Sequence, residues 1–247
     1  MMDSKRYLQF LMIVVLILIF LPGIGIDLYA PSLPAIANHM QISVMLAKNT
    51  ITITMFGLAV GGLFFGTLMD VVGRKKVIVF GLLIFMVASF LACYADNIVQ
   101  LMIIRFIQGV MISAAAIGSR TLVMDNFTGK QLTIAMLYTS IAYGLGPIIG
   151  PFVGGILQHY FFWQANFMAY GVYSFILFLL VCFGVRDRYI ADEAFHFKTI
   201  FKNYVQVLCH REFLAGMVIL GGVLFFQLLF AVVGPFVVQE ELGYSSI

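Results

Sequence analysis

Long apolar runs separated by short polar segments are the dominant pattern along the 247 residues of this chain. A membrane-spanning helix needs about 20 consecutive apolar residues, and runs of that length recur along the whole sequence. Each run predicts a helix, because backbone groups exposed to lipid must form their hydrogen bonds within the segment. Seven such helices are predicted, at residues 7–37, 47–69, 77–94, 98–123, 132–157, 164–185 and 213–238.

Composition supports the same fold class, an all-α polytopic membrane protein. Hydrophobic residues make up 62% of the chain and charged residues 10%, whereas soluble domains carry about 25% charged residues. The net charge of +3 comes from cations that flank apolar runs, so we expect the lipid bilayer and no nucleic acid as a partner. Cys93, Cys182 and Cys209 are isolated from one another, so we expect neither a disulfide nor a metal site.

The distribution of lysine and arginine predicts the orientation in the membrane. Basic flanks face the cytoplasm, and Lys48 is the only cation on one alternating set of flanks. We therefore expect a multi-pass protein of the cell inner (plasma) membrane with a cytoplasmic N-terminus. The opposite set of flanks contains Lys5, Arg6, Arg74, Lys75, Lys76, Arg120, Lys130, Arg186, Arg188, Lys198, Lys202 and Arg211.

The longest polar connection covers residues 186–211. Its apolar and basic residues interleave at helical spacing, which predicts an amphipathic helix on the cytoplasmic leaflet. A plain solvated linker is the alternative.

Asp27 is an acid within the first apolar run, in the segment DLYAPSLPAI. An acid within a span is a functional candidate, because a carboxyl group that gains and loses a proton there can couple proton movement to transport. The alternative is an acid in water near the outer interface. Pro31 and Pro34 each remove a backbone hydrogen bond, so we expect the outer end of this helix to bend.

Arg105 lies about seven residues into the helix 98–123, roughly 10 Å from its outer end. Such an arginine needs a partner or a water-filled cavity. Gln108 lies on nearly the same face, and Asp27 is the obvious carboxylate partner. A structural arginine satisfied by carbonyl groups is the alternative. Tyr29, Gln108 and, in the seventh helix, Gln227 are candidates for lining a substrate cavity.

The helix 132–157 carries a run of small residues and prolines, YGLGPIIGPFVGG. Gly146, Gly150 and Gly154 recur every four residues and form a small face that allows close helix packing. Pro147 and Pro151 allow a kink. The run predicts a bent helix at a moving interface, with static packing as the alternative.

The loop sequence GTLMDVVGRKK, residues 66–76, lies on the cytoplasmic side of the predicted topology. Asp70 and Arg74 are four residues apart and can pair, while Gly73 between them indicates a turn. After the next helix pair, Asp125 either caps a turn or pairs with Arg120. We find no nucleophile elbow, phosphate-binding loop or metal-spaced His/Cys set, and therefore expect no enzyme, metal or cofactor.

Four motifs in order resemble those of the major facilitator superfamily of transporters. DLYAPSLPAI resembles the helix 1 motif of bicyclomycin-resistance-type drug:proton antiporters, and GTLMDVVGRKK the superfamily loop motif. RFIQG (105–109) resembles the helix 4 motif associated with proton transfer, and GLGPIIGPFVGG the helix 5 antiporter motif. The resemblance covers essentially the whole chain.

The resemblance implies roles for these residues. Asp27 would titrate protons and Arg105 would modulate it. Gly66, Asp70, Gly73 and Arg74 would form the cytoplasmic gating motif. The antiporter motif would consist of Gly146, Pro147, Gly150, Pro151, Gly154 and Gly155.

The resemblance also implies domains and a function. The family has two six-helix halves, so we expect a six-helix bundle at 1–185, a linker at 186–211 and the first helix of an incomplete second bundle at 212–247. A partner chain or missing helices would complete it. We expect proton-coupled efflux of drug-like amphipathic molecules; the alternatives are transport of a metabolite, peptide or siderophore, and a truncated non-transporting remnant or subunit.

Overall fold

The computed structural model describes residues 4–186, 206 and 209–236, and the described chain is helical with no strand. Six of its helices are long and apolar enough to cross a membrane, which confirms the predicted all-α fold class. The elements are α1 (Ser4–Asp27), η1 (Ala30–Ser32), α2 (Leu33–His39), α3 (Val44–Val72), α4 (Arg74–Ala92), α5 (Ile98–Asn126), α6 (Gly129–Tyr160), α7 (Gln164–Gly184) and α9 (Arg211–Phe236).

The helices from α1 to α7 belong to one compact unit and α9 to another. The helix α9 covers most of the predicted seventh helix. The predicted amphipathic helix at 186–211 lies almost wholly outside the described residues.

Polar caps and one glycine determine where several helices begin. Ser43 accepts a hydrogen bond from the Leu46 N–H at 3.2 Å at the start of α3, and Asn97 accepts one from the Gln100 N–H at 3.0 Å at the start of α5. Both side chains satisfy N–H groups that lack intrahelical acceptors. Gly73 separates α3 from α4 with φ of 104°, which glycine adopts readily. The predicted break at Gly73 is therefore present, but the rest of the predicted loop at 66–76 is helical, within α3 and α4.

The first predicted helix is not continuous. The helix α1 ends at Asp27, and the segment then forms η1 and the short helix α2. Pro31 has no N–H to donate to the Asp27 carbonyl, and Pro34 has none for Ala30. The prediction of one helix at 7–37 is therefore wrong in its outer third, while the expected bend is present.

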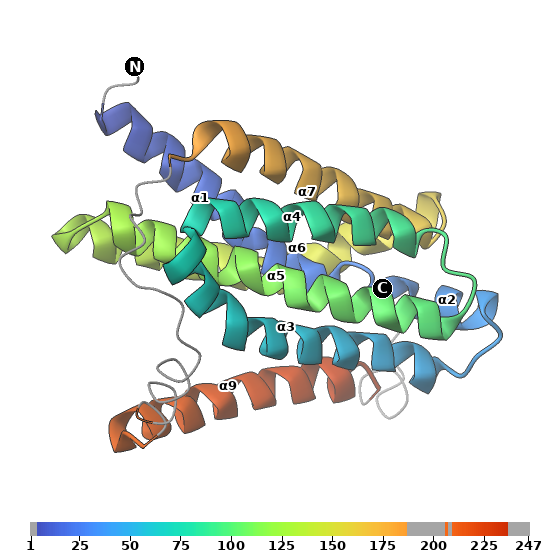
Figure 1. Cartoon of the computed structure of the whole chain (residues 1–247). Helices are drawn as coiled ribbons and strands as arrows, with labels where there is room; N and C mark the ends of the chain where they lie inside the picture. Colours follow the sequence, from blue (N-terminus) through green and yellow to red (C-terminus); the bar gives the residue numbers. More distant parts are fainter. Residues whose placement is uncertain (1–3, 187–205, 207–208, 237–247) are drawn as a thin grey trace. The chain divides into compact units, whose positions relative to one another are not determined.

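The helices α1 and α3 to α7 lie side by side in the first unit, with α3 along α5 and α1 along α6 (Figure 1). Glycines bring α3 and α5 to backbone contact. A methyl group on Gly57 would overlap the Phe106 carbonyl of α5, and one on Gly109 would overlap the Thr54 carbonyl of α3. Small residues allow this approach, which helices in membranes use to gain packing energy.

Large apolar side chains cover the outside of the first unit. Phe152 and Phe183 are 72% and 83% exposed, and similar side chains are exposed on α3, α4 and α5. A soluble monomer rarely exposes apolar surface on this scale. The exterior is that of a helical bundle surrounded by lipid.

Candidate functional site

Arg105 on α5 is the largest fully buried side chain among the described residues. One of its terminal nitrogens, Nη1, donates to Gln108 Oε1 at 2.9 Å. The other, Nη2, donates to the Gly25 carbonyl of α1 at 3.1 Å. A buried guanidinium needs such hydrogen bonds because desolvation of its charge is costly.

Aromatic rings complete the surroundings of this guanidinium. Its central carbon lies 4.1 Å from the ring centroid of Tyr29, 5.8 Å from that of Phe167 and 5.9 Å from that of Tyr170. The ring faces attract the cation electrostatically. Arg105 Nε, in contrast, is buried without a hydrogen-bond partner in the described part of the chain.

Hydrogen bonds to neighbouring helices fix this cluster in place. Gln108 Nε2 donates to Ser89 Oγ of α4 at 2.8 Å, and Ser89 Oγ donates to the Phe85 carbonyl at 2.7 Å. Tyr29 Oη lies 2.7 Å from Thr50 Oγ1 of α3. Because Gln108 uses its oxygen for Arg105 and its nitrogen for Ser89, its amide orientation is determined.

The guanidinium meets α1 near the end of that helix. The last carbonyls of a helix lack intrahelical donors and carry partial negative charge. Arg105 donates to Gly25, and Tyr170 Oη donates to the Ile24 carbonyl at 3.0 Å. These two side chains, from α5 and α7, therefore stabilise the end of α1.

Asp27 is the last residue of α1 and is partly buried. Among the described residues its carboxyl group makes no hydrogen bond and no ion pair. The two side chains therefore form no ion pair in this conformation, although Arg105 acts electrostatically on the Asp27 carboxyl group, as expected from the sequence. Arg105 donates instead to the Gln108 amide and to one carbonyl, that of Gly25, so the alternative of an arginine satisfied by carbonyl groups is met only in part.

The glycine face of α6 packs against α1 at this same end. A methyl group on Gly146 would overlap the Gly23 backbone, and one on Gly154 would overlap the Leu28 carbonyl. A Cβ on Gly150 would lie 3.3 Å from the Leu28 N and 3.6 Å from the Asp27 Cβ. The small face therefore lies directly over Asp27.

The remaining residues of the predicted antiporter motif lie outside this contact or leave the helix continuous. A Cβ on Gly155 would meet nothing within 4 Å, so this glycine is outside the contact. Pro147 and Pro151 lie inside α6, which continues through both from Gly129 to Tyr160.

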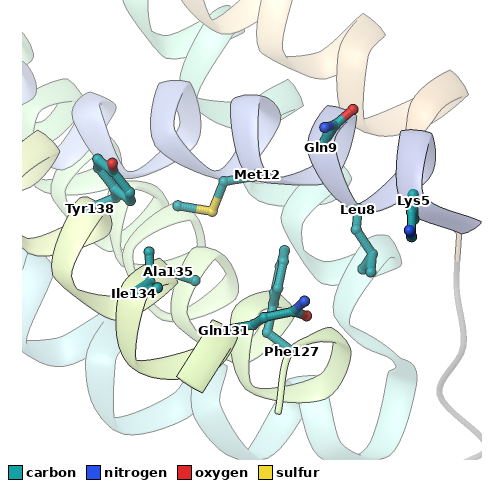
Figure 2. A pocket seen from close by; sticks show the side chains of 9 residues that line it. All are labelled: Lys5, Leu8, Gln9, Met12, Phe127, Gln131, Ile134, Ala135 and Tyr138. Atoms are coloured by element: carbon teal, nitrogen blue, oxygen red, sulfur yellow. The ribbon is translucent and has the colours of Figure 1, made fainter. Parts of the chain in front are cut away.

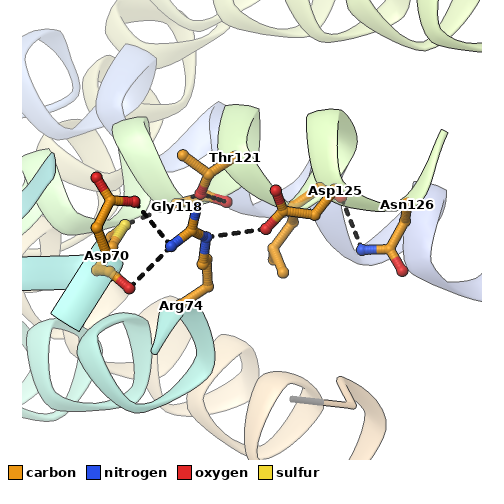
Figure 3. Close-up of polar contacts among 8 residues, drawn as sticks. Asp70, Arg74, Gly118, Thr121, Asp125 and Asn126 are labelled. Carbon is orange, nitrogen blue, oxygen red and sulfur yellow. Dashed lines mark hydrogen bonds and ion pairs between the residues drawn. The ribbon is translucent and has the colours of Figure 1, made fainter. Parts of the chain in front are cut away.

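Arg74, at the start of α4, forms the second polar cluster (Figure 3). Its Nη1 lies 2.8 Å from Asp70 Oδ1 and donates to the Met69 carbonyl at 3.0 Å. Its Nε donates to Asp125 Oδ2, at the end of α5, at 2.8 Å. Arg74 thus links the ends of three helices. Gly66 has open space where a Cβ would be and takes no part.

Sequence reasoning linked Asp125 with a turn or with Arg120, and the structure pairs it with Arg74 instead. Arg120, expected on a basic flank, lines a cavity of about 360 Å³ between α1, α3, α5 and α6. The spacing of its α5 residues marks one helical face, a signal that sequence reasoning missed. The lining residues are Pro22, Leu58, Gly62, Ser113, Ala116, Ile117, Arg120, Thr121 and Tyr143.

The predicted cavity residues lie elsewhere. Tyr29 and Gln108 are fully buried around Arg105, so neither side chain reaches a cavity surface in this conformation. Gln227 belongs to α9, and its side chain is outside the described part of the chain.

The buried arginine, the glycine-packed helices and the apolar exterior together define a polytopic helical membrane protein. The sequence model of the Major Facilitator Superfamily matches residues 15–247, so this chain belongs to that superfamily. The superfamily is one of transporters, which agrees with the expectation that the chain is not an enzyme.

Relatives in this superfamily include transporters named for drug resistance. The chain is 27% identical to the bicyclomycin resistance protein homolog of Haemophilus influenzae over 81% of its length and 51% of the relative. It is 28% identical to multidrug resistance protein MdtM of Escherichia coli K12 over 80% of its length and 48% of the relative. The chain is 28% identical to the uncharacterized MFS-type transporter YdgK of Bacillus subtilis over 92% of its length and 58% of the relative. The chain spans about half the length of these relatives.

Proposed function

We propose that this chain works in proton-coupled efflux of drug-like amphipathic small molecules by alternating access. We further propose that it lies in the cell inner membrane with its N-terminus in the cytoplasm. The resistance names of its relatives and the cavity beside Arg120 support this function. Further helices, from the same gene product or a partner chain, would face the cavity to complete it.

The observation that carries the proposal is the unused donor of a buried cation next to an unpaired acid. Arg105 Nε has no partner among the described residues, and Asp27 has neither hydrogen bond nor ion pair there. A movement of the α1 end that brought the carboxylate to this nitrogen would form an ion pair. Charge-assisted bonds of this kind favour the ionised acid, so closing the contact would release the proton from Asp27.

The packing of α6 on α1 would couple this contact to the transport cycle. Because Gly146, Gly150 and Gly154 let the two backbones touch, a shift of α6 must move the end of α1. Proton uptake by Asp27 and the position of α6 are therefore linked mechanically in this proposal. Tyr29 and Gln108 hold Arg105 in place.

The Arg74 cluster would act as the cytoplasmic gate. Arg74, Asp70 and Asp125 connect the ends of α3, α4 and α5. Thr121 lines the cavity one helical turn before Asp125, so opening of the gate would reach the cavity wall through α5.

The test is transport by the complete gene product that contains this chain, reconstituted in vesicles with an imposed pH gradient. Ethidium is the probe, and Asp27→Asn is compared with Asp96→Asn, which changes an exposed acid in the α4–α5 connection. We expect proton-driven ethidium transport with Asp96→Asn and at least a tenfold loss with Asp27→Asn.

Equal proton-driven transport by Asp27→Asn and the unchanged protein would overturn the assignment of Asp27. If no drug is moved, a panel of metabolites, peptides and siderophores under both gradient directions tests the alternative substrate classes. Absence of transport for every compound would favour the non-transporting subunit over the proposed function.

A further inference from the structure

A second cavity of about 380 Å³ lies between the first turns of α1 and of α6 (Figure 2). It is separate from the cavity beside Arg120, since the two share no residue. Its volume falls in the range of small-molecule sites in proteins. The lining residues are Lys5, Leu8, Gln9, Met12, Phe127, Gln131, Ile134, Ala135 and Tyr138.

The polar lining residues of this cavity suit an anion. Lys5 is the only charged residue in the lining, and no carboxylate is present to neutralise it there. Gln9 and Gln131, which also line the cavity, carry amides that can donate hydrogen bonds. The first turn of α6, which contains Gln131, has no acidic residue, and Thr128 provides no side-chain cap. The partial positive charge of that helix end adds to the charge of Lys5.

The charged and amide residues of the lining gather toward the starts of the two helices, where Leu8 and Phe127 also line the cavity. Along α1 the lining residues Lys5, Gln9 and Met12 follow one another by a turn each. Along α6, Gln131 is followed one turn later by Ala135, and then by Tyr138. Figure 2 shows Lys5 and Gln131 toward one end of the cavity and Met12 and Tyr138 toward the other. A ligand with a charged head and an apolar tail fits this arrangement.

We propose that this cavity binds an anionic amphiphile, with its head group at Lys5, Gln9 and Gln131 and its tail along Met12 and Ile134. The proposal rests on the proposed cytoplasmic N-terminus, which places Lys5 at the leaflet where anionic lipids gather. The head group accepts hydrogen bonds from the ammonium and the two amides. Two sources carry this chemistry: an anionic phospholipid of the bilayer and a free single-chain acid.

The experiment measures binding of defined amphiphiles to the purified protein in neutral detergent by native mass spectrometry. Phosphatidylglycerol and phosphatidylcholine with identical tails, and separately oleate, are the probes. We expect phosphatidylglycerol or oleate to bind about fivefold more tightly than phosphatidylcholine, the effect of about one favourable charge contact. Binding of phosphatidylglycerol alone identifies the phospholipid as the source, and binding of oleate alone identifies the free acid.

Four variants locate the effect. Lys5→Gln removes the preference for the anionic probe, while Lys5→Arg retains it. Lys76→Gln is the matched control, because it removes an exposed cation at the start of α4, outside the cavity lining. Ile134→Trp fills the tail end of the cavity at a partly exposed position, 44% accessible, and lowers affinity for the anionic probe with Lys5 intact.

Equal binding of anionic and zwitterionic probes overturns the proposal. So does a preference lost equally with Lys5→Gln and Lys76→Gln, since the attraction would then belong to the whole surface. Because the readout is binding and not transport, failure here leaves the Asp27 test intact. Loss of transport in Asp27→Asn likewise does not change the expected binding to this cavity.

Discussion

Two arginines of the first unit differ in their burial and in the charge of their partners. Arg105 is fully buried, and its hydrogen-bond partners, the Gln108 amide and the Gly25 carbonyl, are neutral. Arg74 is 12% exposed and lies between two carboxylates, those of Asp70 and Asp125. Within the described part of the chain, the more buried cation is thus the one without an ion pair, which is the costlier arrangement.

The difference indicates different purposes. A paired arginine near the end of a helix links neighbouring helices, and its charge is neutralised by the carboxylates beside it. A buried arginine whose hydrogen-bond partners are neutral keeps a strong positive potential within the bundle, so a carboxylate that approaches it gains more than it would at the surface. The cost is retained where the charge is useful to function.

The largest expected effect comes from removing the buried cation. Arg105→Leu leaves the Gln108 oxygen and the Gly25 carbonyl without a donor, and each such loss costs about 1–3 kcal/mol. We expect the free energy of unfolding to fall by about 4 kcal/mol, measured by thermal unfolding in detergent. Arg105→Lys should recover less than half, because a lysine lacks the fork that reaches both acceptors. Full recovery of the free energy of unfolding with lysine would mean that the site needs only a positive charge and not the shape of the guanidinium.

The next largest effect is expected from a variant that displaces the end of α1, next to Arg105, and leaves the Arg74 cluster unchanged. Gly154→Val forces the new side chain into the Leu28 carbonyl and displaces the acceptor region used by Arg105. We expect a loss of about 2 kcal/mol from overpacking, with no change in cross-linking between cysteines placed at Asp70 and Asp125. Gly155→Val is the control, because that position has open space, and should be nearly neutral. Equal losses for both would contradict the packing of α6 on α1.

A smaller effect is expected at the exposed cluster. Removing the Arg74 charge with Arg74→Gln should cost about 1 kcal/mol, since partly exposed ion pairs contribute little. A double-mutant cycle with Asp125→Asn measures the coupling between the two side chains. The coupling should shrink in 0.5 M salt, because salt screens exposed charges, whereas the Arg105→Leu effect should not. A salt-independent coupling would show that this pair is more buried than its exposure indicates.

The smallest effect is expected for Asp27→Asn. Because its carboxyl group makes no hydrogen bond or ion pair with the described residues, its loss should change the free energy of unfolding by less than about 0.5 kcal/mol. Thermal unfolding measured beside the transport assay then separates a functional loss from misfolding. A large destabilisation would mean that Asp27 already has a structural partner.

Much of the fold follows from local sequence pattern. The apolar runs predicted the six membrane-length helices, and Gly73 and the asparagine cap at Asn97 mark real helix ends. The break after Asp27 was missed, although the proline at 31 that prevents continuation was noted. A proline leaves the carbonyl four residues before it without a hydrogen-bond donor. The helix therefore ends several residues before the proline that interrupts it.

The site was predicted less completely, because its contacts join distant parts of the chain. Residue type alone singled out Arg105, since a charge in an apolar run needs an explanation. Its acceptor at Gly25 is a backbone carbonyl 80 residues away, which no side-chain pattern reports. The partner of Arg74, Asp125, is likewise 51 residues away. Arg120 was assigned to a flank because orientation rules count charges and ignore which helical face carries them.

The break in the first membrane segment has a consequence for bilayer thickness. Unbroken, its 35 residues would extend about 52 Å at 1.5 Å per residue, well beyond the hydrocarbon thickness of about 30 Å. Ending α1 after 24 residues shortens the rigid part to about 36 Å, and the short helix α2 can tilt separately. Hydrophobic mismatch would therefore act at the joint beside Asp27, which makes lipid chain length a physical variable for this carboxyl group.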